Sequence, residues 1–493
     1  MSDDGERGAG EAARASACRA VLARIADESI ETVRVGWCDL HGVLRGKTLV
    51  AGALEGALAS GVSMVSTILL KDTSDRTAYR VFDAAVGDAP PGFRFANNLV
   101  LRLDPASFRT LPWAPGTGWI RSEACFDDGA PVPIDTRRIL EAALARLAAA
   151  GYGLRCGLEV EFHVYRLVAP DDDPSLDPTR AAWPGEPPRV TMVHPGYNLL
   201  AEGWADLADE PLAIVRAAAE GLGLSLRSLE IELGPSQLEA VFDPADALVA
   251  ADNMVLFRNG VRQALRRAGY HASFVCLPPF ANAMASGWHL HHSLVDLASG
   301  ANAFVRASPA AGSNEGDATH VLSDAGAHWL AGLLAHGRAM APLCVPTINA
   351  YARFRPNAMA PQSVVWGRDN RGAMLRVLGG AGDAATRIEN RIGEPMANPY
   401  LYFAAQIHAG LDGIERRLVP PREASSPYAD GGEALPTSLG EALDALAGDD
   451  VLVRAFTPQV VDWFTRIKRA EIGRHAAADD SAAWQAREYF SRF

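Results

Sequence analysis

The chain has 493 residues, of which 48% are hydrophobic and 21% charged, and its formal net charge at pH 7 is −13. This charge argues against nucleic acid or an anionic membrane surface as the main partner. No apolar run approaches the roughly 18–20 residues that cross a bilayer, and the polar, acidic start does not resemble a secretory signal. The six cysteines are scattered without a C-x-x-C pair, which is typical of a reducing compartment. We therefore expect a cytoplasmic protein.

The first part of the chain predicts a small β-rich domain. Residues 1–20 are small and polar, and we expect them to be flexible. Two short β-type runs flank a turn at His41–Gly42, which predicts a hairpin. The sequence between residues 102 and 135 is rich in Asp and Pro, which indicates a boundary between domains. We place the N-terminal domain at residues 21–125.

Residues 126–493 predict a larger α/β domain in which strands and helices alternate. Asp135 is placed to cap a helix, and Gly151 is placed to end it. The other predicted elements are strands at 157–165, 271–280 and 286–295, a helical region at 243–269, and loops at 169–188, 307–319 and 420–436.

Three of the 12 histidines lie within four residues of one predicted strand, in the stretch SGWHLHHSL. Side chains alternate along a strand, so His289 and His291 share one face and His292 points to the other. Two imidazoles side by side could bind a metal, hold a phosphate or belong to an ordinary polar strand. This stretch alone leaves the three alternatives open.

Carboxylates share a face on three other predicted strands. They are Glu159 with Glu161, Glu230 with Glu232 and the following Glu239, and Glu389 between Arg387 and Arg391. The first stretch alone also fits an edge strand with a solvated face, and the second alone also fits a polar strand end. If the glutamates converged, they would repel each other unless a cation neutralised them. Oxygen ligands with one imidazole suit Mg²⁺ or Mn²⁺ better than zinc.

Arginines are dense in the stretch from 353 to 391, which contains only three acidic residues. They are Arg353, Arg355, Arg368, Arg371, Arg376, Arg387 and Arg391. A guanidinium grips phosphate or carboxylate with two parallel hydrogen bonds, so the cluster indicates an anionic substrate. Carboxylates that could bind a metal, together with arginines that could bind phosphate, indicate phosphoryl transfer from a nucleotide. The P-loop pattern G-x-x-x-x-G-K-[ST] is absent.

From about residue 30 to 470 the chain resembles the glutamine synthetase superfamily, because seven motifs occur in the family's order. They are VRVGWCDLHGVLRGK, GLEVEF, IELGPSQLE, SGWHLHHSL, PTINAYARF, RDNRGAMLR and TRIENRIGEPMANPYL. The resemblance implies an α+β fold, in which an N-terminal β-grasp domain precedes a catalytic α/β domain with a curved antiparallel sheet. It also implies a homo-oligomer of stacked rings, commonly a dodecamer, in which the neighbouring N-terminal domain completes each active site.

The resemblance also implies roles for particular residues, with ATP as a substrate and two or more Mg²⁺ or Mn²⁺ ions at the site. The residues that match the family's ligands of the first ion are Glu161, Glu232 and Glu239. Those that match the ligands of the second ion are Glu159, His289 and Glu389. The residues that match the ATP side are His291, Ser293, Arg371, Arg376 and Arg387. Arg353 and Arg391 match the arginines that bind glutamate, and Arg371 and Arg391 are the expected catalytic residues. His292 has no family role and is expected to be structural or solvated.

The reaction that the resemblance implies has two steps. The γ-phosphoryl group of ATP is transferred to the glutamate side chain, and an amine then displaces phosphate from the acyl phosphate. The sequence departs from the family pattern at the amine side. Met359 stands in place of a flap glutamate, and Met284 and Ala285 stand where an asparagine and a glycine normally contact the amino acid. The D-G-S-S segment that binds ammonium is absent from the region STILLKDTSDR, in which Asp72 or Asp75 could substitute.

These departures remove anionic groups that would attract and deprotonate ammonium, which has no lone pair until a base removes a proton. Methionine offers a soft, apolar wall instead. We therefore expect a ligase that joins glutamate to a small neutral or apolar amine, such as an arylamine or alkylamine. An ammonia-using glutamine synthetase, a γ-glutamylpolyamine synthetase and a non-catalytic family member are the alternatives.

Overall fold

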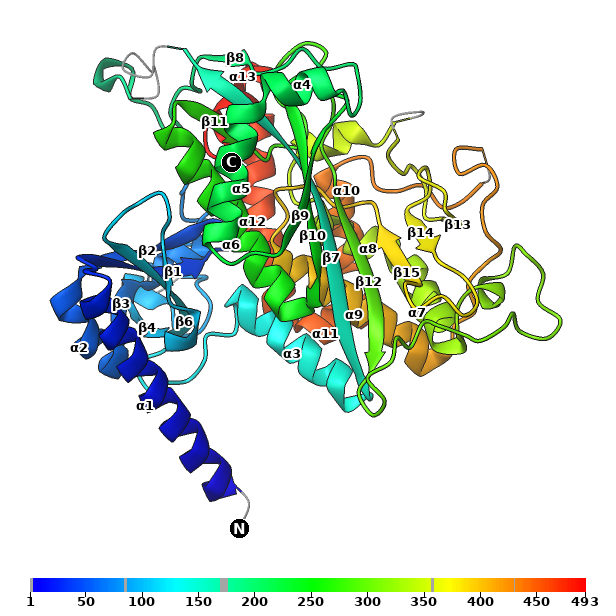
Figure 1. Cartoon of the computed structure of the whole chain (residues 1–493), viewed down its shortest axis with the longest axis horizontal. Coiled ribbons are helices and arrows are strands. Elements are labelled where there is room, and N and C mark those ends of the chain that lie inside the picture. The colour runs from blue at the N-terminus through cyan, green and yellow to red at the C-terminus, as the bar shows by residue number, and fades with distance from the viewer. Residues whose placement is uncertain (1–2, 84–86, 169–175, 356–358, 430) are drawn as a thin grey trace.

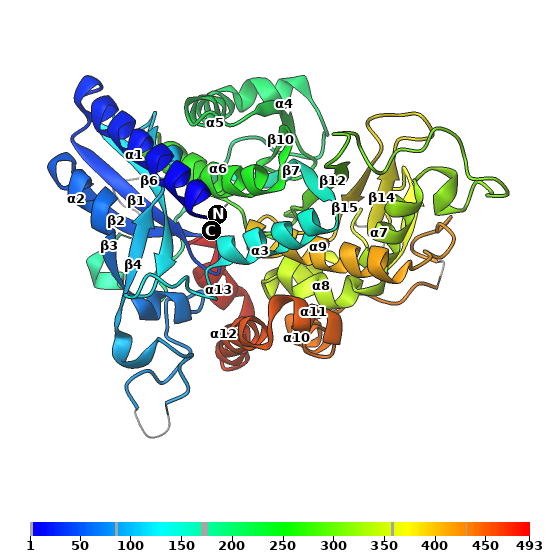
Figure 2. The ribbon, with the colours of Figure 1, turned by 90° about the horizontal axis from the view of Figure 1, so that it is seen from below.

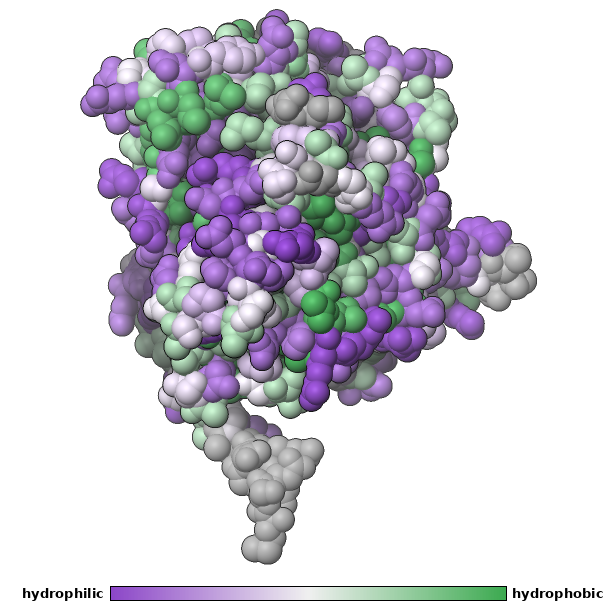
Figure 3. Space-filling view, turned by 90° about the vertical axis from the view of Figure 1, so that its right-hand side faces the viewer, coloured by the Kyte–Doolittle hydropathy of each residue, from purple (hydrophilic) through white to green (hydrophobic). Residues whose placement is uncertain are grey.

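The computed structural model describes residues 3–83, 87–168, 176–355, 359–429 and 431–493 (Figure 1). Two β-sheets lie in different parts of the molecule, and most of the helices surround the second sheet (Figures 1 and 2). The face in Figure 3 is largely hydrophilic, with hydrophobic residues in small separate patches. Within the described ranges, no helix combines the length and apolar character that crossing a membrane requires.

The first sheet contains six strands in the order β2-β1-β6-β4-β3, with β5 paired to β6. The predicted hairpin is confirmed, because β1 and β2 pair antiparallel around a turn in which Gly42 has a φ of +73°. The last strand ends at Cys125, next to the predicted domain boundary. The elements of this part are β1 Thr32–Cys38, β2 Leu44–Val50, α2 Leu54–Ser60, β3 Val62–Val65, β4 Asn98–Leu103, β5 Arg109–Thr110 and β6 Thr117–Cys125.

The expectation of a flexible segment over residues 1–20 needs correction, because helix α1 spans Asp3–Asp27. The segment is rich in Ala, Glu and Arg, which have high helix propensities. Arg14 anchors the helix to the first sheet, since its guanidinium donates to the carbonyl oxygens of Leu103 and Leu58 at 2.9 and 3.1 Å. The apolar residues near its end pack against the core.

The second sheet contains nine strands in the order β13-β14-β15-β12-β7-β10-β9, and β8 and β11 also pair with β7. All its pairings are antiparallel except that of β13 with β14. Because β7 lies between β10 and β12, the alternative of a polar edge strand is wrong. The strands are β7 Tyr152–Leu167, β8 Val190–Met192, β9 Leu226–Ile231, β10 Gln237–Asp246, β11 Tyr270–Ser273, β12 Trp288–Asp296, β13 Trp366–Arg368, β14 Leu375–Leu378 and β15 Arg387–Asn390.

Helices cover one face of the second sheet, and their apolar contacts hold it in place. The ring of Phe162 in β7 lies 5.8 Å from that of Phe257, and Trp288 in β12 lies 5.1 Å from Tyr402. Full burial of such side chains contributes about 1.5–3 kcal/mol each. The helices are α3 Thr136–Ala149, α4 Glu202–Leu207, α5 Asp209–Gly221, α6 Ala247–Arg267, α7 Asp324–Ala335, α8 Gly337–Cys344, α9 Pro399–Arg416, α10 Leu439–Ala447, α11 Asp450–Phe456, α12 Pro458–Ala476 and α13 Ser481–Gln485.

A buried histidine lies where four of these helices meet. His336 lies between α7 and α8, with Nδ1 2.6 Å from Asp449 Oδ2 and Nε2 3.0 Å from Asp412 Oδ2. Asp449 caps α11, and Asp412 belongs to α9. Burial alone would lower the pKa of His336, but hydrogen bonds and negative charge from the two aspartates outweigh it and raise the pKa.

The contacts of His336 with Asp449 and Asp412, here called the His336 clamp, predict that the free energy of unfolding falls as the pH rises above neutrality. A histidine whose pKa is higher in the folded protein than in the unfolded chain stabilises the folded protein. This contribution is complete when the pH is below the ordinary pKa of 6.5, and it is lost as the pH rises through the pKa of the folded state. Urea unfolding midpoints should therefore fall between about pH 6 and about pH 9, and the fall should be smaller in the His336→Gln variant, in which only other groups such as Glu161 contribute. The half-buried His475, replaced by Gln, is the control. A pH dependence in His336→Gln that equals that of the wild type would contradict the role of His336.

Candidate active site

Strands β7, β12 and β15 bring one imidazole and two carboxylates together. In the ladder, Glu159 lies opposite His289, and Glu389 lies opposite His291. One ligand atom from each of Glu159, His289 and Glu389 lies within 4.8 Å of the other two. His289 Nδ1 is 3.6 Å from Glu159 and 3.7 Å from Glu389, which is close enough for one cation to contact all three. His289 and His291 point to this face, as the alternation predicts.

A second group of carboxylates lies one strand further along. Glu161 of β7 lies opposite Glu239 of β10, and Glu232 follows β9 beside them. Glu161 accepts hydrogen bonds from the backbone N–H of Gly287 at 2.8 Å and from Gln237 Nε2 at 3.2 Å. The role of Gln237 was missed from the sequence, because an amide between two acids gives no motif of its own.

The two groups adjoin each other, since His289 Nε2 lies 3.9 Å from Glu161 Oε1. Burial and the neighbouring carboxylates raise the pKa of Glu239 to about 10 and that of Glu161 to about 7. Burial and the charge of Arg391 lower the pKa of His289 to about 4, so its imidazole is neutral. Carboxylates that repel one another beside a neutral imidazole fit a divalent cation with oxygen ligands.

Two arginines hold the buried carboxylate of Glu389. Arg376 Nη1 donates to Glu389 Oε2 at 3.0 Å, and Arg391 Nη1 donates to Oε1. Arg376 also pairs with Asp369, and Arg391 Nε donates to the carbonyl oxygen of Arg371 at 3.0 Å. Both guanidinium groups therefore lie at the cluster but are engaged with protein acceptors.

The other predicted arginines lie differently. Arg353 is buried beside Gly287, and its guanidinium donates to the carbonyl oxygens of Arg391, Ile392 and Gly393. The side chain of Arg371 is exposed. The structure thus brings Arg353 to the cluster, although its donors serve the backbone, and the predicted contacts of both residues with substrates stay predictions.

A cavity of about 970 Å³ opens beside the histidine strand. His291, Ser293, Arg387 and Glu159 line part of it. Arg387 Nε donates to His291 Nδ1 at 3.1 Å, and His291 Nε2 lies 3.0 Å from Glu159 Oε1. Three of the five residues predicted for the ATP side therefore share one cavity that ends at the carboxylates.

His292 points to the opposite face of the sheet, as predicted. It is buried, and its Nε2 accepts a hydrogen bond from Trp329 Nε1 of α7 at 3.0 Å. Its role is structural, because it satisfies the indole N–H of a buried tryptophan.

Apolar side chains gather beside Glu232. The loop at Tyr197–Leu200 runs along the strand end, because Tyr197 N donates to Leu233 O at 2.7 Å and Leu200 N to Ile231 O at 3.0 Å. The Tyr197 hydroxyl bonds to the carbonyl oxygen of Asn282, which ties this loop to the loop with Met284 and Ala285. Met284 packs on Gly234, where an added Cβ would lie 2.8 Å from the Met284 Cβ.

The side chains of Tyr197 and Leu200 are exposed, and so is that of Met359, the residue at the expected flap position. Tyr197 is 56% exposed, Leu200 62% and Met359 57%. Met359 also lies near the arginines, since Arg391 Nη2 donates to its carbonyl oxygen at 3.4 Å. Tyr197 and the leucines after it were missed from the sequence, where they read as ordinary loop residues between glycine and alanine.

The aspartates that could replace the ammonium ligand have local partners. Asp72 is buried, and its carboxylate accepts from the backbone N–H groups of Ser74 and Arg76 and from Arg474 Nε at 2.8 Å. Asp75 faces Arg45, with a separation of 3.2 Å. The structure thus commits the carboxylate of Asp72 to its own turn and to α12.

Comparisons with known proteins agree with this arrangement. Residues 133–489 match the family model described as "Glutamine synthetase, catalytic domain". The chain is 37% identical over 488 residues to the gamma-glutamylanilide synthase of Acinetobacter sp, which covers 96% of this chain and 95% of that protein. It is 32% identical over 480 residues to the gamma-glutamylethanolamide synthetase of Streptomyces coelicolor, which covers 95% of each. The solved structure "GmaS/ADP complex-Conformation 1" has a TM-score of 0.73 and 27% identity, covering 95% of this chain and 98% of that chain.

The chain therefore belongs to the glutamine synthetase family of ATP-dependent ligases, and it resembles the gamma-glutamylamide synthetases of that family.

Proposed function

We propose that the protein joins the γ-carboxylate of glutamate to a small neutral or apolar amine, through a γ-glutamyl phosphate formed from ATP. The observation that carries the proposal is a group of six potential metal ligands on one face of the second sheet, here called the six donors. They are Glu159, Glu161, Glu232, Glu239, His289 and Glu389, and they lie beside two arginines and the 970 Å³ cavity. A carboxylate is a poor acyl donor because its oxygen is a poor leaving group, and phosphorylation replaces that group with phosphate.

Two divalent ions, Mg²⁺ or Mn²⁺, fit the donors. Glu161, Glu232 and Glu239 would hold one ion, and Glu159, His289 and Glu389 the other. The ions would neutralise charge on the ATP phosphates and on the transferred phosphoryl group. An ion at Glu389 would also weaken its bonds to Arg376 and Arg391, which leaves their N–H groups available to anionic substrates.

In this proposal, ATP lies in the 970 Å³ cavity with its phosphates toward His291, Ser293 and Arg387. Arg371 and Arg376 would offset charge on the transferred phosphoryl group. Arg353 and Arg391 would hold the glutamate, next to Met284 and Ala285. These roles are supported by the short distances within the cluster and by the family to which the chain belongs.

Two features support an apolar amine: the apolar residues Tyr197, Leu200 and Met284 in the loops beside Glu232, and Met359 at the position of the flap glutamate. A neutral amine carries its own lone pair, so it attacks without the anionic groups that ammonium requires. The buried Asp72, held by Arg474, agrees with the absence of a carboxylate for ammonium. The similarity to a protein named gamma-glutamylanilide synthase points to the same class of amine.

We also propose that the six-stranded first sheet is a β-grasp domain and that the chain assembles into stacked rings, as a dodecamer in the cytoplasm. The support is the family resemblance and the six free cysteines, which suit a reducing compartment. A non-catalytic role is disfavoured because all six donors are present and most are close together.

The amine proposal predicts that wild-type protein uses an arylamine or alkylamine in preference to ammonia. Replacing Met359 with Glu restores a carboxylate at the flap position, so kcat/KM for ammonia should rise relative to the apolar amine by about tenfold or more. Phosphate release with a panel of ammonia, ethylamine, aniline and putrescine measures this ratio.

The matched control is Met192→Glu, which makes the same change at another exposed methionine, on β8. It should leave the ratio unchanged. Wild-type protein that works best with ammonia or putrescine would contradict the proposal, and no turnover with any amine would favour a non-catalytic protein.

The metal assignment predicts that Glu389→Ala and Glu389→Gln lower acyl-phosphate formation by about 100-fold or more, because they remove an ion ligand. Hydroxylamine traps the acyl phosphate as a coloured hydroxamate, which gives the rate. Glu230→Gln is the control, since Glu230 lies opposite Glu239 but outside the donor set. The Gln variant keeps an acceptor for Arg376 and Arg391, so circular dichroism can confirm its fold. A near wild-type rate would show that the assignment is wrong.

The raised pKa values of Glu161 and Glu239 predict a pH dependence of metal binding. In the metal-free protein the protonated carboxyls stabilise the folded state, and their contribution is complete below their ordinary pKa of 4.5. It is lost as the pH rises through about 7 for Glu161 and about 10 for Glu239. A cation binds the deprotonated carboxylates, so the rise in Tm on adding Mn²⁺ should grow between about pH 6 and about pH 8. A Tm shift that shrinks with rising pH would contradict this prediction.

A further inference from the structure

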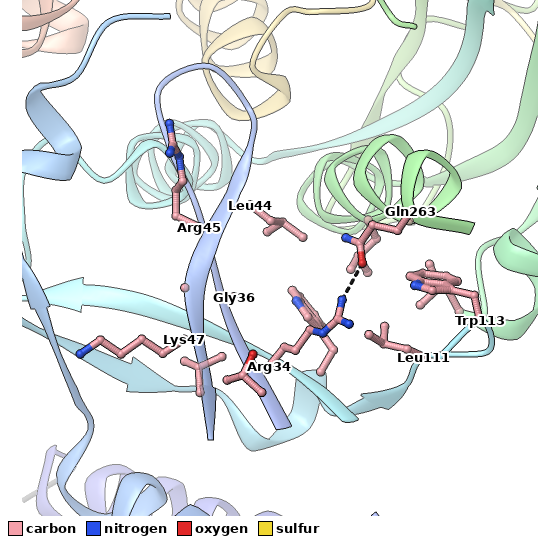
Figure 4. Close-up of a pocket in the computed structure, with 15 residues that line it drawn as sticks. Arg34, Gly36, Leu44, Arg45, Lys47, Leu111, Trp113 and Gln263 are labelled. Carbon is pink, nitrogen blue, oxygen red and sulfur yellow. Dashed lines mark hydrogen bonds between the residues drawn. The ribbon is translucent and has the colours of Figure 1, made fainter. Parts of the chain in front are cut away.

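A second cavity, of about 220 Å³, lies between the first sheet and α6, and none of its lining residues belongs to the candidate active site (Figure 4). Strands β1, β2 and β6 form one side of it. Helix α6, the end of α5 and the loop at Leu111–Trp113 form the other. A molecule bound here would contact both the N-terminal sheet and the part of the chain that carries the active site.

Apolar and polar surface contribute almost equally to the walls, and two glycines let indole rings lie directly on the backbone. A Cβ at Gly36 of β1 would overlap the indole of Trp119, and a Cβ at Gly260 of α6 would lie 2.9 Å from Trp113 Cη2. Glycine destabilises a strand or a helix relative to alanine, so its presence at both positions is explained by the close packing of these rings. Leucine side chains complete the walls.

Hydrogen-bond donors dominate the polar end of this cavity. Arg34 Nη1 donates to Gln263 Oε1 at 2.7 Å, and no carboxylate lies within ion-pair distance of Arg34 among the residues that the structure describes. The indole N–H of Trp113 is buried, and it has no acceptor in the described part of the chain. Figure 4 shows its nitrogen on the side of the ring that faces Gln263 and Arg34.

The other cations of the lining do not complete this arrangement. Arg45 is paired with Asp39 and Asp75, and the Lys47 side chain extends away from Arg34 in Figure 4. The lining contains no aspartate or glutamate. Among the described residues, then, the only partner of the Arg34 side chain is a neutral amide, and the buried Trp113 donor beside it has no acceptor; this arrangement fits an anionic ligand.

We propose that this cavity binds a small aromatic carboxylate. Its ring would lie between Trp113 and Trp119, and its carboxylate would accept hydrogen bonds from Arg34 and the Trp113 indole N–H. The size agrees, because a cavity of about 150 Å³ holds a benzene ring and this one has room for a carboxylate as well. The inference does not depend on the proposed reaction or on its amine.

Benzoate is the probe, and its binding to the full chain is measured by tryptophan fluorescence, calorimetry and the shift in Tm. Benzamide has the same shape without the charge, and acetate has the charge without the ring. Benzoate should bind saturably and raise Tm, whereas benzamide and acetate should bind at least about tenfold more weakly.

Variants locate the binding. Arg34→Gln should weaken benzoate binding about tenfold or more, because it removes the charge. Trp113→Phe keeps an aromatic ring but removes the N–H donor, and it should weaken binding by a smaller factor. Lys47→Gln removes a charge from the same lining without affecting Arg34, so its binding should match the wild type.

Four outcomes would overturn the inference, and the first three concern the cavity itself. They are no saturable binding of benzoate, binding that benzamide or acetate equals, and binding that persists unchanged in Arg34→Gln, which would place the benzoate elsewhere. Since Glu389→Gln should not affect benzoate binding, a loss of binding in that variant alone would assign the ligand to the candidate active site and also overturn the inference.

Discussion

The candidate active site depends on the antiparallel register of four adjacent strands, β10, β7, β12 and β15. This register places Glu161 opposite Glu239 and Glu159 opposite His289, and the pleat turns them to one face. A slip by one residue would turn the charged side chains into the apolar layer, where Phe162 packs on α6. Packing of the helices on one face of the sheet therefore also fixes the positions of the charged side chains on the other face, because the same strands carry both sets of residues.

Gathering so many charges has an electrostatic cost, and the structure offsets it in different ways. Glu389 has Arg376 and Arg391, and Glu161 has a backbone N–H and Gln237. Burial and repulsion raise the pKa of Glu161, Glu232 and Glu239, so these carboxyls favour protons, which a divalent cation would displace. Such a site suits an ATP-dependent ligase, because a divalent ion held there and the arginines would together offset charge during phosphoryl transfer.

Much of this arrangement could be predicted from local pattern. Strand alternation alone placed His289 and His291 together and His292 apart, and motif order placed the carboxylates near them. The pairing of Glu389 with two arginines, the backbone bonds of Arg353 and the His336 clamp could not be predicted. Each depends on how distant segments pack, and a single arginine or histidine carries no sign of its eventual acceptor. The N-terminal helix was missed because composition suggested flexibility, whereas its propensity and the bonds of Arg14 favour order.

The central claim is that the six expected metal ligands bind two divalent ions on one face of the second sheet. Crystals grown with Mn²⁺ and an ATP analogue, measured at the manganese absorption edge, would test it most directly. The account predicts two anomalous peaks, one among Glu161, Glu232 and Glu239 and the other among Glu159, His289 and Glu389. Peaks elsewhere on the molecule, or an ordered analogue with no manganese at these side chains, would contradict it.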